Sequence, residues 1–276
     1  MDAQPPKFAD LRVRLVSAIV LGGVALLMIW LGGVWAAALI AAMAAAMAWE
    51  WRAITHCRGA HPGAGGIAAA GACGTAVLTA EVLGPVLAPT MLAAGVAGLA
   101  AADLMQGRRT SAVWTIAGLT IIGGAAIALL ALRNTEPHGF ISALWVVIVV
   151  AGADTGGYFA GRLIGGPKLW PSVSPKKTWA GLFGGIALAA AGGGLFSWAT
   201  TGTYYYEVCT VSAAAAILAQ AGDLAESAVK RHFGVKDAGS LFPGHGGALD
   251  RFDGLMAATI VAAVVTFWRG KTVFIW

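Results

Sequence analysis

The chain has 276 residues, of which 58% are hydrophobic and only 11% are charged. Soluble domains usually carry about 25% charged residues, so this composition excludes an ordinary soluble protein. The net charge of +5 does not by itself indicate nucleic acid, because basic residues also favour cytoplasmic loops and attract phosphates and anionic lipids. The aromatic residues lie in or beside apolar runs rather than within a basic patch, so we expect no nucleic-acid partner.

Apolar stretches of about 20 residues recur along the whole chain, which is the length needed to cross a bilayer. The first follows Lys7, Arg12 and Arg14 and could imitate a signal peptide. Another apolar stretch follows at once, so we predict a first transmembrane helix instead. In chain order the predicted spans are 13–31, 34–50, 66–83, 86–102, 112–132, 141–161, 179–200, 205–230 and 254–268. The predicted fold is therefore an all-α, polytopic integral membrane protein with about nine transmembrane helices.

The two halves of the chain differ in polar content. We predict that residues 1–140 form a scaffold of membrane helices, with possible dimer contacts, and that residues 141–276 form a catalytic membrane region. Two long loops, near 162–178 and 231–253, interrupt this second region. With a cytoplasmic N-terminus, 15 of the 18 Lys and Arg residues fall on the cytoplasmic side, because only Arg133, Arg269 and Lys271 fall opposite. This bias predicts that both long loops face the cytoplasm, and it leaves the side of the C-terminal tail open.

Asp154 lies within the apolar run that ends near residue 161. A carboxylate near membrane depth is costly and usually has a partner or a function, although an Asp at a helix end near water is the alternative. The loop that follows carries hydroxyl and ammonium groups suited to a polyphosphate, among them Ser174, Lys176, Lys177 and Thr178. Ser174 and the proline after it also predict a helix start, whose free N–H groups favour anions. An ordinary basic cytoplasmic loop is the alternative.

Two further groups of acidic residues follow. On a helix, Asp223 can share one face with Glu226 three residues later and Ser227 four residues later, unless these residues form only a solvated charged face. Asp250 and Asp253 are three apart, so a helix that starts near them presents both carboxylates to one side, with helix capping as the alternative. Carboxylates on the same face as many Lys and Arg residues indicate a divalent cation that holds phosphates, and Mg²⁺ prefers such oxygens.

Other classes of site lack their motifs. The sequence contains no Walker A motif, no nucleophile elbow and no Cys/His zinc spacing. The many glycines have a packing explanation, since small residues let transmembrane helices approach closely.

The stretch SAVKRHFGVKDAGSLFPGHGGALDRFD, residues 227–253, resembles the signature of the phosphatidate cytidylyltransferase family, also called CDP-diacylglycerol synthase. Upstream, GDLAES and ADTGGYFAGRLIGG…SPKKTWAG are also similar to motifs of that family, so the resemblance covers about residues 153–253. Ala180 departs from the acidic or amide residue that relatives often carry, which puts one polar contact in doubt. The family positions match Ser227, Lys230-Arg231, Lys236-Asp237, Pro243, His245-Gly246-Gly247, Asp250-Arg251 and Asp253.

The resemblance implies a membrane enzyme that makes CDP-diacylglycerol and pyrophosphate from CTP and phosphatidate. It implies a need for Mg²⁺, a possible K⁺ ion beside it, a homodimer, and an active site facing the cytoplasm from the inner (plasma) membrane. It also implies metal binding by Asp223 and Asp250, and we expect Asp253 nearby.

The remaining roles are predictions for the same reaction. Lys230, Arg231 and His245 join Asp223 and Asp250 in the catalytic set, with His245 contacting pyrophosphate or orienting a ligand. The predicted substrate-binding set is Ser174, Lys176, Lys177, Thr178, Ser227, Lys236, Gly246, Gly247, Arg251 and Asp154. Two other functions stay open: a CTP-dependent lipid-alcohol kinase of the polyprenol type, and an ion-coupled transporter, since acidic residues within the membrane also mark ion pathways.

Overall fold

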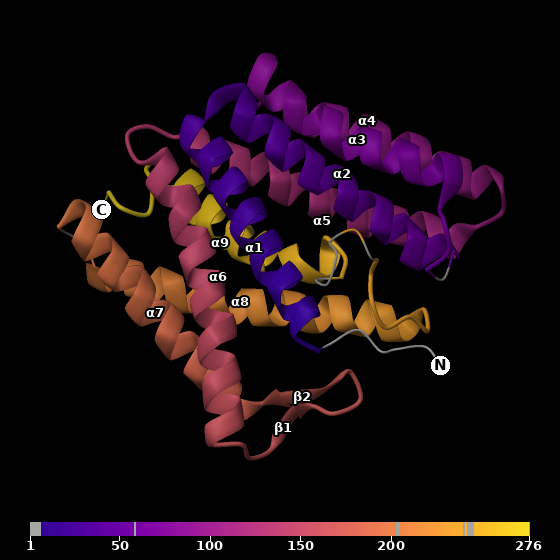
Figure 1. The fold of residues 1–276 in the computed structure, drawn as a ribbon. Helices are drawn as coiled ribbons and strands as arrows, with labels where there is room; N and C mark the ends of the chain where they lie inside the picture. The colour runs from indigo at the N-terminus through magenta and orange to yellow at the C-terminus, as the bar shows by residue number, and fades with distance from the viewer. Residues whose placement is uncertain (1–6, 58, 203–204, 240, 242–245, 276) are drawn as a thin grey trace.

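The computed structural model describes the backbone of residues 7–57, 59–202, 205–239, 241 and 246–275, and side chains from Ile19 onward apart from Tyr205 (Figure 1). Within these residues the chain forms nine α-helices and one two-stranded hairpin. The helices are α1 (Lys7–Leu31), α2 (Gly33–Cys57), α3 (Gly63–Val82), α4 (Leu87–Met105), α5 (Arg109–Asn134), α6 (Gly139–Leu163), α7 (Trp179–Thr201), α8 (Tyr205–His232) and α9 (Leu249–Arg269). The strands are β1 (Lys168–Trp170) and β2 (Ser174–Thr178).

The helices confirm the predicted fold class. Each predicted span coincides with one helix, in order, and eight of the helices are long and apolar enough to cross a membrane. In α1, the described apolar part is the shorter segment Ile19–Leu31. Large apolar side chains such as Met105 and Phe267 are almost fully exposed on the protein surface, as expected where a helix faces lipid. The chain is therefore a multi-pass membrane protein.

The loop near residues 162–178 contains the antiparallel hairpin, with Lys168 opposite Thr178 and Trp170 opposite Ser174. The predicted helix start at Ser174 is wrong, because α7 begins only at Trp179. Thr178 caps this helix: its Oγ1 accepts a hydrogen bond from the N–H of Gly181 at 3.1 Å. Proline fits at the free edge of a two-stranded sheet, where its missing N–H removes no ladder bond, so Pro175 is compatible with the strand.

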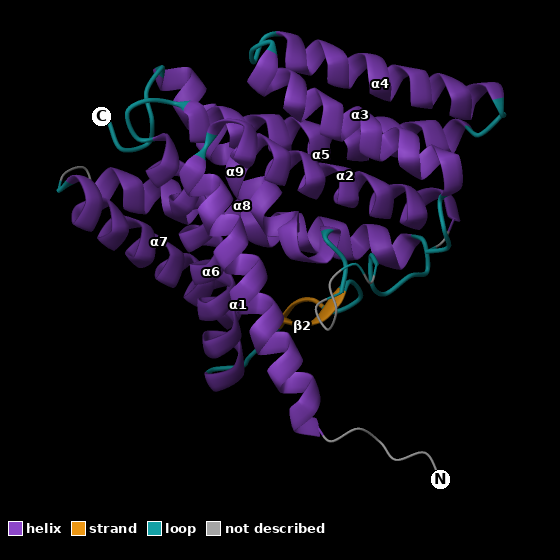
Figure 2. Ribbon diagram, turned by 45° about the horizontal axis from the view of Figure 1, so that its top comes forward, coloured by secondary structure: helices purple, strands orange, loops and turns teal. Residues whose placement is uncertain are grey.

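The helices pack into two groups. Figures 1 and 2 show α2–α5 side by side, α6 and α7 as a separate pair, and α9 between the two groups. One hydrophobic cluster joins α2–α5 to the start of α9, and it includes Ala238, Ala248 and Leu249. The second joins α6–α9 and includes Phe274 of the C-terminal segment. The described residues between α8 and α9, such as Ala238 and Ala248, are thus packed against the N-terminal helices, although they belong to the C-terminal half.

Glycines bring α6 and α7 into backbone contact. A Cβ atom added to Gly156 would lie 2.4 Å from the carbonyl oxygen of Gly184, and one added to Gly184 would lie 2.2 Å from the Cβ of Ala160. Such distances leave no room for any side chain, which agrees with the packing explanation for the glycines. The close pair places the hairpin at the end of α6 (Figure 1).

Candidate active site

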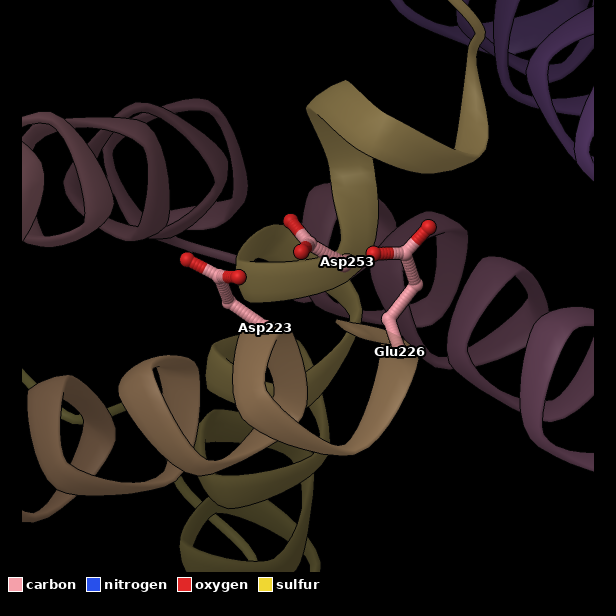
Figure 3. Close-up of side chains that lie close together, drawn as sticks. All are labelled: Asp223, Glu226 and Asp253. Atoms are coloured by element: carbon pink, nitrogen blue, oxygen red, sulfur yellow. The ribbon is translucent and has the colours of Figure 1, made fainter. Parts of the chain in front are cut away.

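Three carboxylates gather where α8 and α9 cross. One oxygen of each of Asp223, Glu226 and Asp253 lies within 4.8 Å of those of the other two. Figure 3 shows Asp223 and Glu226 extending from α8 toward Asp253 on α9. Helical spacing of three places the two α8 residues on one face. Gly222 lets α9 approach, because a Cβ there would lie 2.9 Å from the Cβ of Ala257.

The charges of this carboxylate cluster are only partly satisfied. Glu226 is 7% exposed, and its Oε1 has no hydrogen-bond partner among the described residues. Asp253 Oδ1 accepts the N–H of Gly254 at 2.6 Å, and Ser227 Oγ donates to Asp223 Oδ1 at 3.4 Å. Three carboxylates this close together, one of them buried and two half-buried, are costly unless a proton or a cation lies between them. The cluster therefore has the chemistry of a cation site.

Asp250 is not a member of this group but is bridged to it by Lys230. Its Oδ1 is 2.5 Å from Lys230 Nζ, and the same ammonium lies 2.8 Å from Glu226 Oε2. Its Oδ2 accepts the backbone N–H groups of Ala238 at 3.0 Å and Gly247 at 3.1 Å. Both oxygens of Asp250 are thus engaged by the protein itself. The expectation that Asp250 binds metal stays a prediction. Glu226, which helical spacing placed on the same face as Asp223, joins the cluster although it was not among the predicted metal ligands.

A cavity of about 250 Å³ adjoins the cluster at Asp223. It gathers four predicted substrate-binding residues from α6 and the hairpin: Asp154, Lys176, Lys177 and Thr178. Lys177 Nζ lies 2.7 Å from Asp223 Oδ2, so the hairpin contacts α8 directly. Two ammonium groups beside carboxylates make a cavity suited to an anion that brings its own cation.

The other predicted residues are spread more widely. Ser174 pairs with Trp170 in the hairpin and does not line this cavity. Arg231 lines a separate cavity of about 530 Å³ with Thr55 and His56. Lys236 and Arg251 are exposed.

The loop before α9 holds the remaining predictions. Gly246 has a φ of +87°, a conformation that favours glycine, and the N–H of Gly247 is donated to Asp250 rather than left for phosphate. His245 and Pro243 lie outside the described residues. Their roles stay predictions.

Two residues of the site were not among the predicted site residues. Glu226 completes the carboxylate cluster, and its spacing from Asp223 on the helix was the available signal. Gln220 lines the cavity and donates from Nε2 to the carbonyl oxygen of Ala153 at 3.4 Å. Its position three residues before Asp223 places it on the same helix face.

Known proteins similar to this chain include a protein family and several enzymes. The model of the family described as "Cytidylyltransferase family" matches residues 12–268. A phosphatidate cytidylyltransferase from Brucella suis biovar 1 (strain 1330) is 40% identical over 256 residues, which cover 91% of this chain and 91% of the relative. The enzyme of that name from Brucella abortus (strain 2308) has the same identity and coverage. A phosphatidate cytidylyltransferase from Bacillus subtilis (strain 168) is 40% identical over 126 residues, 45% of this chain and 47% of the relative.

Proposed function

The chain belongs to the cytidylyltransferase family, and we infer from this membership and from the site that it transfers a cytidylyl group from CTP to phosphatidate. The products are CDP-diacylglycerol and pyrophosphate, so the chain is a nucleotidyltransferase of phospholipid synthesis. The observation that carries this conclusion is the carboxylate cluster of Asp223, Glu226 and Asp253 on membrane helices, which adjoins a cavity lined by two lysines of the hairpin.

The carboxylate cluster fits a magnesium ion. Mg²⁺ takes carboxylate, water and phosphate oxygens, and Glu226 Oε1 is a buried oxygen with no donor among the described residues. In this proposal Asp223, Glu226 and Asp253 hold the ion. When bound, Mg²⁺ supplies positive charge against the triphosphate. The described residues contain no second group of this kind, so the K⁺ ion implied by the resemblance stays a prediction.

The protein's own groups position two anionic reactants. A phosphate oxygen of phosphatidate attacks the α-phosphorus of CTP in line, the bond to the bridging oxygen breaks, and pyrophosphate leaves. Lys176 and Lys177 line the cavity and are placed to hold phosphate groups. Phosphatidate is already ionised, so the reaction needs no general base. Charge neutralisation and orientation then supply most of the acceleration.

The surroundings of Lys230 and Arg231 differ, and so does the evidence that each residue binds a phosphate. The Lys230 ammonium already contacts Glu226 and Asp250, which favours a role in orienting these two carboxylates. Arg231 lies in the second cavity, away from the residues that line the first. Its contact with a substrate phosphate stays a prediction.

The proposed location is the inner (plasma) membrane, with the site on the cytoplasmic side. The hairpin and the chain between α8 and α9 lie on the side that receives most of the basic residues in the predicted topology. A homodimer remains a prediction based on the resemblance.

One assay separates this function from its alternatives. The purified protein is incubated with phosphatidate and with CTP labelled at the α-phosphate, with and without Mg²⁺. Label in the lipid, dependent on Mg²⁺, is the expected result. With a lipid alcohol supplied in place of phosphatidate, label only in released CDP together with a phosphorylated lipid would indicate the kinase. No consumption of CTP with either lipid would favour the transporter.

A further inference from the structure

Glu50 connects the N-terminal helices to the start of α9. This residue of α2 is 5% exposed, and it accepts the backbone N–H of Ala248 on Oε1 at 3.0 Å and that of Leu249 on Oε2 at 2.8 Å. These donors precede and open α9, and they lie 198 and 199 residues away in the chain. The first N–H groups of a helix have no partner within it, so a carboxylate there satisfies them and is itself satisfied.

Two glycines before α9, Gly239 and Gly247, leave room for this carboxylate. A Cβ atom on Gly239 would lie 2.4 Å from Glu50 Oε1, and one on Gly247 would lie 2.6 Å from Glu50 Oε2. Real Cβ contacts are essentially never this short, so both positions require glycine while Glu50 keeps its place.

Glu50 and Asp250 hold the same loop together. Three consecutive N–H groups, those of Gly247, Ala248 and Leu249, are all donated to these two carboxylates. Asp250 in turn contacts Lys230. A displacement of the start of α9 would therefore disturb this ion pair and would also move Asp253, one turn further along the helix, away from the α8 carboxylates.

We propose that Glu50 is a positioning residue of the active site, which fixes the start of α9 and thereby places Asp250 and Asp253 against α8. The inference rests on the proposed cytidylyl transfer. It assigns a function in the reaction to a side chain of the N-terminal helices, which do not line the lysine cavity.

The test compares Glu50→Gln with wild type in the full-length protein, using the labelled-CTP assay. Glutamine keeps the size but presents an amide NH₂ to one of the two N–H donors. We expect kcat to fall by about 10- to 100-fold, the size of effect that a misplacement of about 1 Å produces. We also expect a higher Mg²⁺ concentration for half-maximal rate, whereas the KM for CTP changes little, because the lysine cavity is untouched. The matched control is Glu81→Gln on α3, where the carboxylate accepts a hydrogen bond from Asn134 Nδ2 at 2.8 Å and full activity is expected.

A second variant keeps the test decisive if Glu50→Gln does not fold. Gly239→Ala retains the carboxylate of Glu50 but displaces it by a steric clash, because the three nearest atoms to the new Cβ all belong to Glu50. The same fall in kcat is expected, and Gly71→Ala on α3, which meets nothing within 4 Å, is its control.

The outcomes separate this inference from the proposed function. Hydrogen exchange of the peptide that contains Ala248 and Leu249 should be faster in Glu50→Gln, which reports on the contact itself. An active wild type whose kcat and Mg²⁺ dependence survive in both Glu50→Gln and Gly239→Ala would overturn the positioning role alone. A wild type that transfers no label to phosphatidate would overturn the proposed function, and this inference with it.

Discussion

Two of the polar clusters among the described helices differ in how their charges are satisfied. In the N-terminal half, Asp103 of α4 accepts from Arg52 Nη1 at 2.9 Å and from Thr115 Oγ1 at 2.6 Å, and His56 Nε2 lies 3.1 Å from the same carboxylate. Arg52 also donates to Thr115 Oγ1 at 2.7 Å. In the C-terminal half, the cluster of Asp223, Glu226 and Asp253 brings three carboxylates together and leaves one oxygen without a donor among the described residues.

The difference separates a structural cluster from a binding cluster. Arg52 and Asp103 neutralise each other and tie α2 to α4, so the first cluster needs nothing from outside. In the second, Lys177 and Lys230 neutralise only part of the negative charge. Charge that these two lysines leave unbalanced within membrane helices is expensive, and a site that binds a cation and phosphates gives a reason for it.

The largest effect is expected at the carboxylate cluster. Asp223→Asn should lower the rate of CDP-diacylglycerol formation by about 100-fold or more, because it removes charge at the point where the cluster meets the cavity. The labelled-CTP assay measures it, with membrane insertion and thermal stability checked in parallel. Glu207→Gln, an exposed carboxylate in the first turn of the same helix, should leave the rate unchanged. Near-normal turnover of Asp223→Asn would exclude the metal role.

Substitutions in the N-terminal cluster around Arg52 and Asp103 should change the stability of the protein rather than its turnover. Arg52→Met leaves Asp103 buried without its cation, which costs about 3–5 kcal/mol when one partner of a buried pair is removed. Denaturant unfolding in detergent measures this loss. The double variant Arg52→Met with Asp103→Leu should recover most of it, since apolar replacement of both partners is often neutral. A loss of turnover at unchanged stability would instead place this cluster in the catalytic machinery.

The close packing of α6 against α7 should give the next largest effect on stability. Gly156→Ala pushes a methyl group into the backbone of α7 at Gly184, which cannot rotate away, so we expect a destabilisation of about 1–3 kcal/mol. Thermal unfolding of the purified protein checks it. Gly192→Ala on α7 serves as the control, because its new Cβ would meet only Ile148 at an ordinary 3.8 Å. Equal stability of the two variants would contradict the close packing of α6 against α7.

The smallest effect distinguishes a cap from a substrate contact. Thr178→Val removes the hydroxyl that caps α7 and should cost about 1 kcal/mol of stability. Thr178→Ser keeps the hydroxyl and should behave as wild type. If Thr178→Val raised the KM for CTP without a loss of stability, the hydroxyl would serve the nucleotide rather than the helix.

The elements that depend on local properties could be predicted from the sequence. Nine apolar runs coincide with nine described helices, because the length of an apolar run sets what can cross a bilayer. The family resemblance rested on fixed spacings, and helical spacing alone was enough to place Asp223 and Glu226 on one face. The hairpin was not predicted, since strands of three and five residues carry little pattern and Pro175 suggested a helix start.

Which charges meet depends on the packing of the helices and could not be predicted from the sequence. Asp250 and Asp253 share a helix and a spacing that predicts one common site, yet the oxygens of Asp250 are taken up by Lys230 and two backbone N–H groups, and Asp250 is not a member of the cluster. Glu50 reaches the start of α9 from nearly 200 residues away. Electrostatic partners are selected by distance in space rather than along the chain. The role of a carboxylate can therefore be inferred only once its neighbours in the folded protein are known.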